Sequence, residues 1–445
     1  MRGSLFLFCL FLLFLGGCER KEQAAAPSQT APQAQQPAVA RQPWAPTEPV
    51  MVELPPGALP TWAKFAQQKP ALVLLSHDPL LRPIPEELRE RARMIAAQGD
   101  AQDLDRHGSI LRPEPLILSS QTVSAALSAD FFSKIYWVFP SKVGAEQLEL
   151  ERFRQQTIET GFLTPEESQQ ITLENGTYSG LVRGIPFSAI HYAQLPRIDE
   201  PLVLHIDLSF FRGLYDNEIR TPLYDLIHQT ANSLRAGGWQ PLATTLSWST
   251  LEGDLSLDTR FVLSNLGQIL QNPALLDQSM PRSWELRAEA LYAADMFSES
   301  KKLELYREAA HLAPEDPTVI YDLFQVHLFS RQLDKALIAL DEAVERDPGY
   351  GAAYLGLVEI ALVDGNLPAA LRLLEKAQAV FPLNPFIAMH QADLYLQLGE
   401  AAKAEALLSP LRELPWSHVY HAEVPALIDD MLSAARNPSP EPSDD

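Results

Sequence analysis

The amino-acid sequence predicts two folded regions: an α/β layered domain with a mostly parallel sheet, followed by an all-α solenoid of helical hairpins. Two observations carry this prediction. From about residue 61 to residue 271, short apolar runs alternate with segments of helical periodicity, as in strands that are joined by helices. From about residue 281 to residue 415, prolines and glycines recur every 34 residues, and a repeat of this length indicates a solenoid.

The first segment has the features of a targeting sequence. Arg2 precedes the apolar run Leu5–Leu15, which is too short to span a bilayer comfortably, and two glycines follow. This pattern predicts a signal peptide over residues 1–17. The Leu-Gly-Gly-Cys run that ends at Cys18 resembles the lipobox of bacterial lipoproteins, which implies that Cys18 becomes the first mature residue and carries lipid. An ordinary secretory peptide with a chance cysteine is the alternative.

Lipid on Cys18 implies a place in the cell envelope. Several acyl chains on one residue anchor a protein stably without a transmembrane helix. Glu19 follows the cysteine, which among bacterial lipoproteins points to the outer membrane. The resemblance therefore implies a lipid-anchored protein of the outer membrane that faces the periplasm.

Two segments are expected to stay disordered. Residues 18–60 are rich in proline, glutamine and alanine and cannot bury enough apolar surface to fold, so we expect a tether that begins at the lipidated Cys18. The tail at 436–445 combines prolines with acidic residues and is expected to behave in the same way.

Composition excludes some classes of partner and site. The formal net charge is -22, so a polyanion would be repelled, and the sequence has no stripe of basic residues to which it could bind. Nucleic acid is therefore excluded as a partner. Cys9 and Cys18 are the only cysteines, so the folded regions can form neither a disulfide nor a thiolate metal site. A metal ion would need histidine and carboxylate ligands.

Residues 61–280 are predicted to form the α/β domain. The candidate strands are continuously apolar or β-branched, and they lie at 71–76, 115–118, 134–139, 178–192 with a turn at Gly184, 202–208 and 242–248. Helices are expected between them at 85–98, 120–129, 146–160, 221–237 and 257–271. Strands separated by helices predict a mostly parallel sheet.

Polar residues stand near the C-terminal ends of two of these strands, where ligands of open α/β sheets bind. They are His77 and Asp78 after the first strand, and His205 and Asp207 in a later one. Alternate strand residues point the same way, so His205, Asp207 and Ser209 share a face and could ligate one divalent metal ion. A purely structural role is the alternative, since Asp78 precedes a proline and suits a turn.

The strand with His205 and Asp207 runs into aromatic residues and so resembles the arginase and deacetylase-like fold. In that family an earlier strand also ends in His and Asp ligands, the position that His77 and Asp78 would occupy. The resemblance implies metal-dependent hydrolysis of amide or amidine bonds. His205 and Ser209 stand where the family carries acidic ligands, and a binuclear site needs several carboxylates, so the departures favour a non-catalytic domain.

Residues 281–435 are predicted to form the solenoid. Pro314, Pro348 and Pro382 are 34 residues apart, and Gly365 and Gly399 keep the same spacing. Within each unit the apolar residues recur at helical spacing, so each unit is expected to contain two short helices.

This pattern resembles the tetratricopeptide repeat, which has small residues at its eighth, twentieth and twenty-seventh positions. Alanines that match these positions are Ala336, Ala343, Ala370, Ala377, Ala392 and Ala404. Lys302 and Phe324 stand where a small residue is expected, so we expect altered packing there. A capping helix is expected over 416–435, because terminal repeats need a modified outer face.

In the tetratricopeptide family the first helices of successive repeats line a concave groove that binds a protein or peptide. The positions of this sequence that match the groove are Tyr321, Gln325, Leu355, Glu359, Met389 and Asp393. This set is apolar and acidic and lacks the basic cluster that clamps a C-terminal carboxylate. The resemblance therefore implies a partner segment with apolar and basic side chains.

The sequence thus favours a lipid-anchored envelope scaffold that binds a protein partner through its repeats. The rival hypothesis is a metal-dependent hydrolase of amide or amidine bonds whose repeats only position it, and a structural spacer is a third. The first two differ in whether His205 and Asp207 are needed.

Overall fold

The structure is a computed structural model, and it describes residues 46–141, 144–214, 223–253, 255–295 and 298–437. All of them belong to one compact unit, Pro43–Asp445. The predicted signal peptide, Cys18, residues 18–45 of the predicted tether and residues 438–445 of the tail lie outside the described residues. In the part of the chain that is described, no helix is long and apolar enough to cross a membrane.

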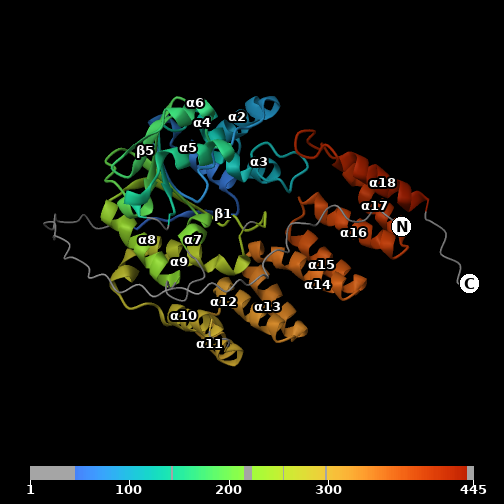
Figure 1. The fold of residues 1–445 in the computed structure, drawn as a ribbon. Helices are drawn as coiled ribbons and strands as arrows, with labels where there is room; N and C mark the ends of the chain where they lie inside the picture. Colours follow the sequence, from blue (N-terminus) through green and yellow to red (C-terminus); the bar gives the residue numbers. More distant parts are fainter. Residues whose placement is uncertain (1–45, 142–143, 215–222, 254, 296–297, 438–445) are drawn as a thin grey trace, which may run out of the picture. The chain divides into compact units, whose positions relative to one another are not determined.

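The predicted fold class is confirmed: a mixed sheet with helices is followed by a helical solenoid (Figure 1). The sheet has the strand order β1-β8-β7-β2-β3-β6-β5-β4. Neighbours from β1 to β6 in this order are parallel, and β4 and β5 are antiparallel at one edge. The strands are β1 Val50–Val52, β2 Ala71–Leu75, β3 Lys134–Phe139, β4 Thr172–Glu174, β5 Thr177–Val182, β6 Ile185–His191, β7 Leu202–Asp207 and β8 Pro241–Ser247.

Helices cover both faces of the sheet, because successive strand residues point to opposite sides. Leu72 and Leu74 of β2 pack into one core, and Val73 and Leu75 pack into the other. The first core includes side chains from α1 Leu59–Ala63, α2 Arg89–Gln98, α3 Ala101–His107, α4 Thr122–Ser128 and α5 Leu150–Glu159. Helix α6 Pro165–Gln169 lies against α5. The second core includes side chains from α7 Ser209–Leu214, α8 Leu223–Gly237 and α9 Phe261–Gln271.

Most predicted strands are confirmed to within one or two residues, but the one predicted at 115–118 is wrong. Its apolar residues Leu116 and Ile117 are buried in a loop instead. Their backbone N–H groups donate to the carbonyl of His107, at 2.8 and 3.1 Å. These two N–H groups therefore bind a carbonyl at the C-terminal end of α3, so they are not available to pair with a strand.

The folded part begins earlier than predicted. The expected disordered tether extended to residue 60, but Val50–Val52 pairs with β8 as the edge strand β1. Pro55 and Pro56 are buried in the short 3-10 helix that follows, Pro55–Ala58. These prolines do not prevent β1 from pairing with β8, because they lie outside the strand, where no N–H group is needed for the hydrogen bonds between strands.

The solenoid consists of helical hairpins and a terminal helix (Figure 1). The predicted small residues lie where the helices of each hairpin meet, and all six are at most 1% exposed. Three turns between paired helices contain a residue with positive φ, namely Arg331 at 55°, Gly365 at 70° and Gly399 at 73°. The helices are α10 Arg282–Asp295, α11 Glu299–Leu312, α12 Pro317–Phe329, α13 Leu333–Arg346, α14 Ala353–Val363, α15 Leu367–Val380, α16 Pro385–Gln397, α17 Ala401–Arg412 and α18 Val424–Arg436.

The terminal helix is shorter than predicted. Helix α18 begins at Val424, whereas we expected a helix from residue 416. Residues 416–421 instead contact the sheet region: Ser417 N donates to the carbonyl of Pro113, and Tyr420 Oη lies 3.0 Å from Gln121 Nε2. These tertiary contacts replace the helix that local periodicity favoured.

Candidate functional site

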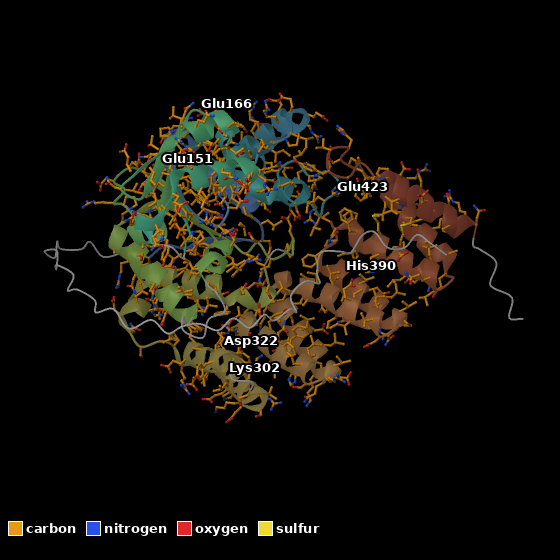
Figure 2. The ribbon with its side chains drawn as sticks, viewed as in Figure 1. Glu151, Glu166, Lys302, Asp322, His390 and Glu423 are labelled. Atoms are coloured by element: carbon orange, nitrogen blue, oxygen red, sulfur yellow. The ribbon has the colours of Figure 1, made fainter. Side chains whose placement is uncertain are left out.

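The face formed by the first helices of the repeats, α12, α14 and α16, contains the six residues predicted to line a groove. Figure 2 labels Asp322 of α12 and His390 of α16, which belong to these helices. The six positions differ sharply in exposure, and they divide the face into a covered part and an open part.

The covered part lies on α12. Tyr321 is 4% exposed, stacks on Tyr350 with a ring distance of 4.4 Å, and accepts a hydrogen bond from Gln325 Nε2 at 2.8 Å. Leu257, from the sheet region, packs on the same core. Burial, with Asp258 nearby, raises the pKa of the Tyr321 phenol. Tyr321 is thus buried under Tyr350 of the repeats, with Leu257–Thr259 of the sheet region packed beside α12.

The open part lies on α14 and α16. Leu355 and Asp393 are half-buried, and Glu359 is exposed. Asp393 accepts a hydrogen bond from Gln397 Nε2 at 2.8 Å. Met389 is the exception among the predicted residues here, because it is only 6% exposed and packs in the core between α16, α17 and α18.

The open part of the face carries acidic side chains. Burial lowers the pKa of His390, while the nearby carboxylates of Glu359 and Asp393 oppose that shift. The charges of both carboxylates therefore act on His390, although Glu359 belongs to the preceding repeat. At the end of α14, Ile360 and Val363 are 44% and 87% exposed. An acidic and apolar surface of this kind is suited to a segment with basic and apolar side chains.

The polar edge of the sheet is the second candidate. Strands β2 and β7 are neighbours in the sheet. The chain leaves β2 toward β3, on one side of this pair, and leaves β7 toward β8, on the other side. The order of strands reverses between them, which is where open α/β sheets bind ligands. As predicted, His77 and Asp78 follow β2, and Asp207 ends β7.

A directed chain of hydrogen bonds holds His205 inside the sheet. Trp62 Nε1 donates to Thr245 Oγ1, which lies 2.8 Å from His205 Nδ1. Ser247 Oγ lies 3.1 Å from His205 Nε2 and donates its proton to Asp207 Oδ2 at 2.5 Å. Because Ser247 has a single hydroxyl proton, which it donates to Asp207, His205 donates from Nε2, and the neutral ring then accepts at Nδ1.

Both residues predicted on β7 are thus engaged in hydrogen bonds within the fold. His205 is fully buried, and its acceptor nitrogen faces a hydroxyl group. Asp207 accepts from the backbone N–H of Ser209 at 2.9 Å and from the hydroxyl group of Ser249. Ser209 does not continue the strand, since it begins α7 and its hydroxyl accepts from His77 N at 3.2 Å.

The predicted turn at Asp78 is present: its carboxylate accepts from Leu80 N at 2.6 Å, two residues on. Burial raises the pKa of Asp78 to about 6. Among the described residues, no three His, Cys, Asp or Glu side chains are grouped so as to hold a metal ion. Metal binding by His205 and Asp207, with His77 and Asp78 as further ligands, stays a prediction.

Sequence reasoning missed the polar residues of β8 that organise this edge. Thr245 and Ser247 alternate on β8 and face His205 and Asp207 from the neighbouring strand, and Ser249, just beyond β8, also donates to Asp207. That alternation was a readable signal, because period-two polar residues mark one face of a strand.

It also missed two buried arginines. Arg260 is fully buried and binds Glu53 and Asp347, while Arg287 is 1% exposed and binds Asp322 and Thr318. Their partners are distant in the sequence, so no local motif reveals them.

Comparisons with known proteins bear on the repeats. The tetratricopeptide repeat family model matches residues 321–385 and 361–411. The BBSome complex member BBS4 of Bos taurus is 32% identical over 102 residues, which are 23% of this chain and 20% of that protein, so this chain spans about a fifth of the length of that relative. A thermophilic tetratricopeptide-repeat protein of Thermus thermophilus is 18% identical, with a TM-score of 0.22, over 42% of this chain and 99% of that one. A structural likeness this low carries no argument, but the family match establishes tetratricopeptide repeats in the C-terminal region.

Proposed function

We propose that this protein is a membrane-anchored scaffold that holds a protein partner on the open part of its repeat face. Tetratricopeptide repeats generally mediate protein–protein interactions, and this chain contains them. The observation that carries the proposal is the contrast along the face: Tyr321 is covered by the chain itself, whereas Glu359 and Val363 on the next first helix are exposed.

The chemistry of the open part narrows the class of partner. Glu359 and Asp393 supply carboxylates around His390, and Ile360 and Val363 supply exposed apolar surface. A partner segment with basic and apolar side chains would pair with both features. This deduction agrees with the sequence-based expectation for the groove.

The anchor is the second part of the proposal. The run that ends at Cys18 supports lipidation there, and the chain from Cys18 to β1 at Val50 would then link the bilayer to the sheet region. We place the protein at the outer membrane, facing the periplasm. The sheet region serves as a support for the repeats, since its Arg260 binds Asp347 of the repeats. Its His205 and Asp207 are engaged in internal hydrogen bonds.

The test uses site-specific photo-crosslinking in the full chain, expressed in a Gram-negative bacterium. A photoreactive residue at position 363 is expected to trap one protein partner, and the same residue at position 372, on the exposed side of α15, is expected not to. Glu359→Lys should abolish the crosslink at 363, while the matched change Glu375→Lys on α15 should leave it intact. Equal crosslinking at both positions, or no effect of Glu359→Lys, would reject the proposal.

A further inference from the structure

The repeat region carries a basic and apolar surface in a chain whose formal net charge is -22. We name it the α11–α13 patch, and its members are Lys302, Arg307, Phe329, Arg331, Leu333 and Lys335. Phe329 is 70% exposed and Leu333 is 54% exposed, so the patch presents apolar surface to solvent. These two apolar side chains stand beside cations instead of the carboxylates that dominate elsewhere.

Contacts hold the patch together across three helices. The Nζ atom of Lys302, on α11, lies 5.4 Å from the ring centre of Phe329, on α12 (Lys302 is labelled in Figure 2). Burial lowers the pKa of His327 on α12, and the charges of Arg307 on α11 and Lys335 on α13 lower it further, so both cations lie near this residue. The patch therefore explains why a lysine stands at position 302, where a tetratricopeptide repeat has a small residue.

The four cations are unpaired among the side chains that the structure describes. None of them forms an ion pair with any described side chain, whereas the nearby Glu304 and Glu308 bind Lys301 and Arg282. Asp334 is exposed in the same segment and offsets one positive charge. The patch thus keeps a net positive charge that faces solvent.

Arg331 occupies a backbone conformation that favours glycine. Its φ is 55°, and the residues at the same place in the next two repeats are Gly365 and Gly399. The left-handed region disfavours a residue with a Cβ atom, so glycine would suit this turn better. Arg331 is exposed and lies between Phe329 and Leu333 in a turn that glycine would fit with less strain. An arginine at this position therefore indicates a role for its charge.

We propose that the α11–α13 patch is the surface through which the chain rests on an anionic lipid bilayer. Phe329 and Leu333 enter the headgroup layer, and the four cations lie against acidic headgroups. Exposed apolar side chains flanked by lysine and arginine are typical of interfacial membrane contacts. The cations come from three helices and do not converge on one point, which suits a field of headgroups better than a single carboxylate.

This inference rests on the proposed anchoring at Cys18. A tether from Cys18 keeps the patch near the bilayer at high effective concentration, so a weak attraction is sufficient. An acidic protein segment is the other occupant that the charge would allow, and the experiment separates the two.

The test measures hydrogen exchange of the full lipidated chain on vesicles. Backbone amides of residues 328–338 are expected to exchange about tenfold more slowly on phosphatidylethanolamine vesicles containing phosphatidylglycerol than on those containing phosphatidylcholine. High salt should remove the difference, because screening shortens the range of the attraction. Arg331→Gly should relieve the strained turn and still weaken the protection.

Matched variants test the charge itself. Arg331→Glu with Lys335→Glu should abolish the protection, whereas Arg106→Glu with Arg372→Glu, which reverses two exposed cations elsewhere, should preserve it. Equal exchange on both lipids while the chain stays bound would overturn the inference alone. Loss of the chain from both vesicle types would refute the anchoring instead. Protection by an acidic amphipathic peptide, but not by vesicles, would assign the patch to a protein and also overturn the proposal.

Discussion

Arg260 and Asp347 join the two regions of the chain: Nη2 of the buried guanidinium lies 3.0 Å from each carboxylate oxygen of Asp347. Arg260 precedes α9 in the sheet region, and Asp347 follows α13 in the repeats. The same guanidinium donates to both oxygens of Glu53 at 2.8 Å and lies 4.5 Å from a ring of Trp248. One side chain therefore links β1's neighbourhood, α9 and the repeats.

Removing this cation should weaken the whole unit. Arg260→Met leaves the carboxylates of Glu53 and Asp347 facing each other without a counter-charge, so we expect a loss of about 3 kcal/mol in the free energy of unfolding. Arg282→Met is the control, because its ion pairs are exposed and should contribute less than about 1 kcal/mol. Urea unfolding of both variants decides the matter, and equal losses would contradict the role assigned to Arg260.

The small residues of the repeats give a second prediction. Ala377 is fully buried between helices, whereas Ala379, two positions along α15, is exposed. Ala377→Leu should push the helices apart and lower the stability by about 1–3 kcal/mol. Ala379→Leu should change it by no more than about 0.5 kcal/mol. Thermal unfolding measures both, and a silent Ala377→Leu would show that the hairpins do not pack as described.

Features with a repeated local pattern could be predicted from the sequence. The 34-residue spacing of Pro314, Pro348 and Pro382 located the hairpins, since each unit reuses the same packing contacts. Continuous apolar runs located β2 and β7 because both of their faces are buried. The positions of His77, Asp78 and Asp207 at one edge of the sheet could be predicted as well, because these residues stand at the C-terminal ends of those two strands.

Features set by distant partners could not be predicted. Val50–Val52 is a three-residue apolar run inside a proline-rich segment, too short to predict a strand on its own, and it forms one by pairing with the distant β8. Tyr321 matched a groove position, yet it is buried, stacks on Tyr350 and lies near Asp258, more than sixty residues earlier in the chain. His205 looked like a metal ligand because the sequence does not show that Thr245 and Ser247 saturate its two nitrogens.

The loop that replaces the start of the predicted capping helix gives a third prediction. Tyr420 packs against the core of the sheet region and hydrogen-bonds Gln121. Tyr420→Ala should cost about 2 kcal/mol of stability and speed amide exchange in residues 112–121. Tyr292→Ala, at a side chain that is 57% exposed, should affect neither quantity. Unchanged exchange in 112–121 for Tyr420→Ala would show that the loop does not hold this contact in solution.

The buried His205 makes stability depend on pH. Burial lowers its pKa to about 4, against the attraction of Asp207, from an ordinary value of 6.5. Between about pH 6.5 and 4 the unfolded chain therefore binds more protons at this position than the folded chain does. The free energy of unfolding should fall as the pH drops through this window, by about 3 kcal/mol at most.

His205→Gln removes the titrating group while the amide can still donate toward Ser247. Asp78 and Asp322, whose pKa values burial raises to about 6, act in the opposite direction, but they are common to both proteins and cancel in the comparison. We expect the variant to be less stable than the parent at pH 7, because it loses the ring contact with Trp62. On acidification the parent should lose more stability than the variant, so the gap should close or reverse near pH 4.5. Urea unfolding at pH 7, 5.5 and 4.5 measures this, and a gap that stays constant would mean that His205 is protonated as easily in the folded protein as in the unfolded chain.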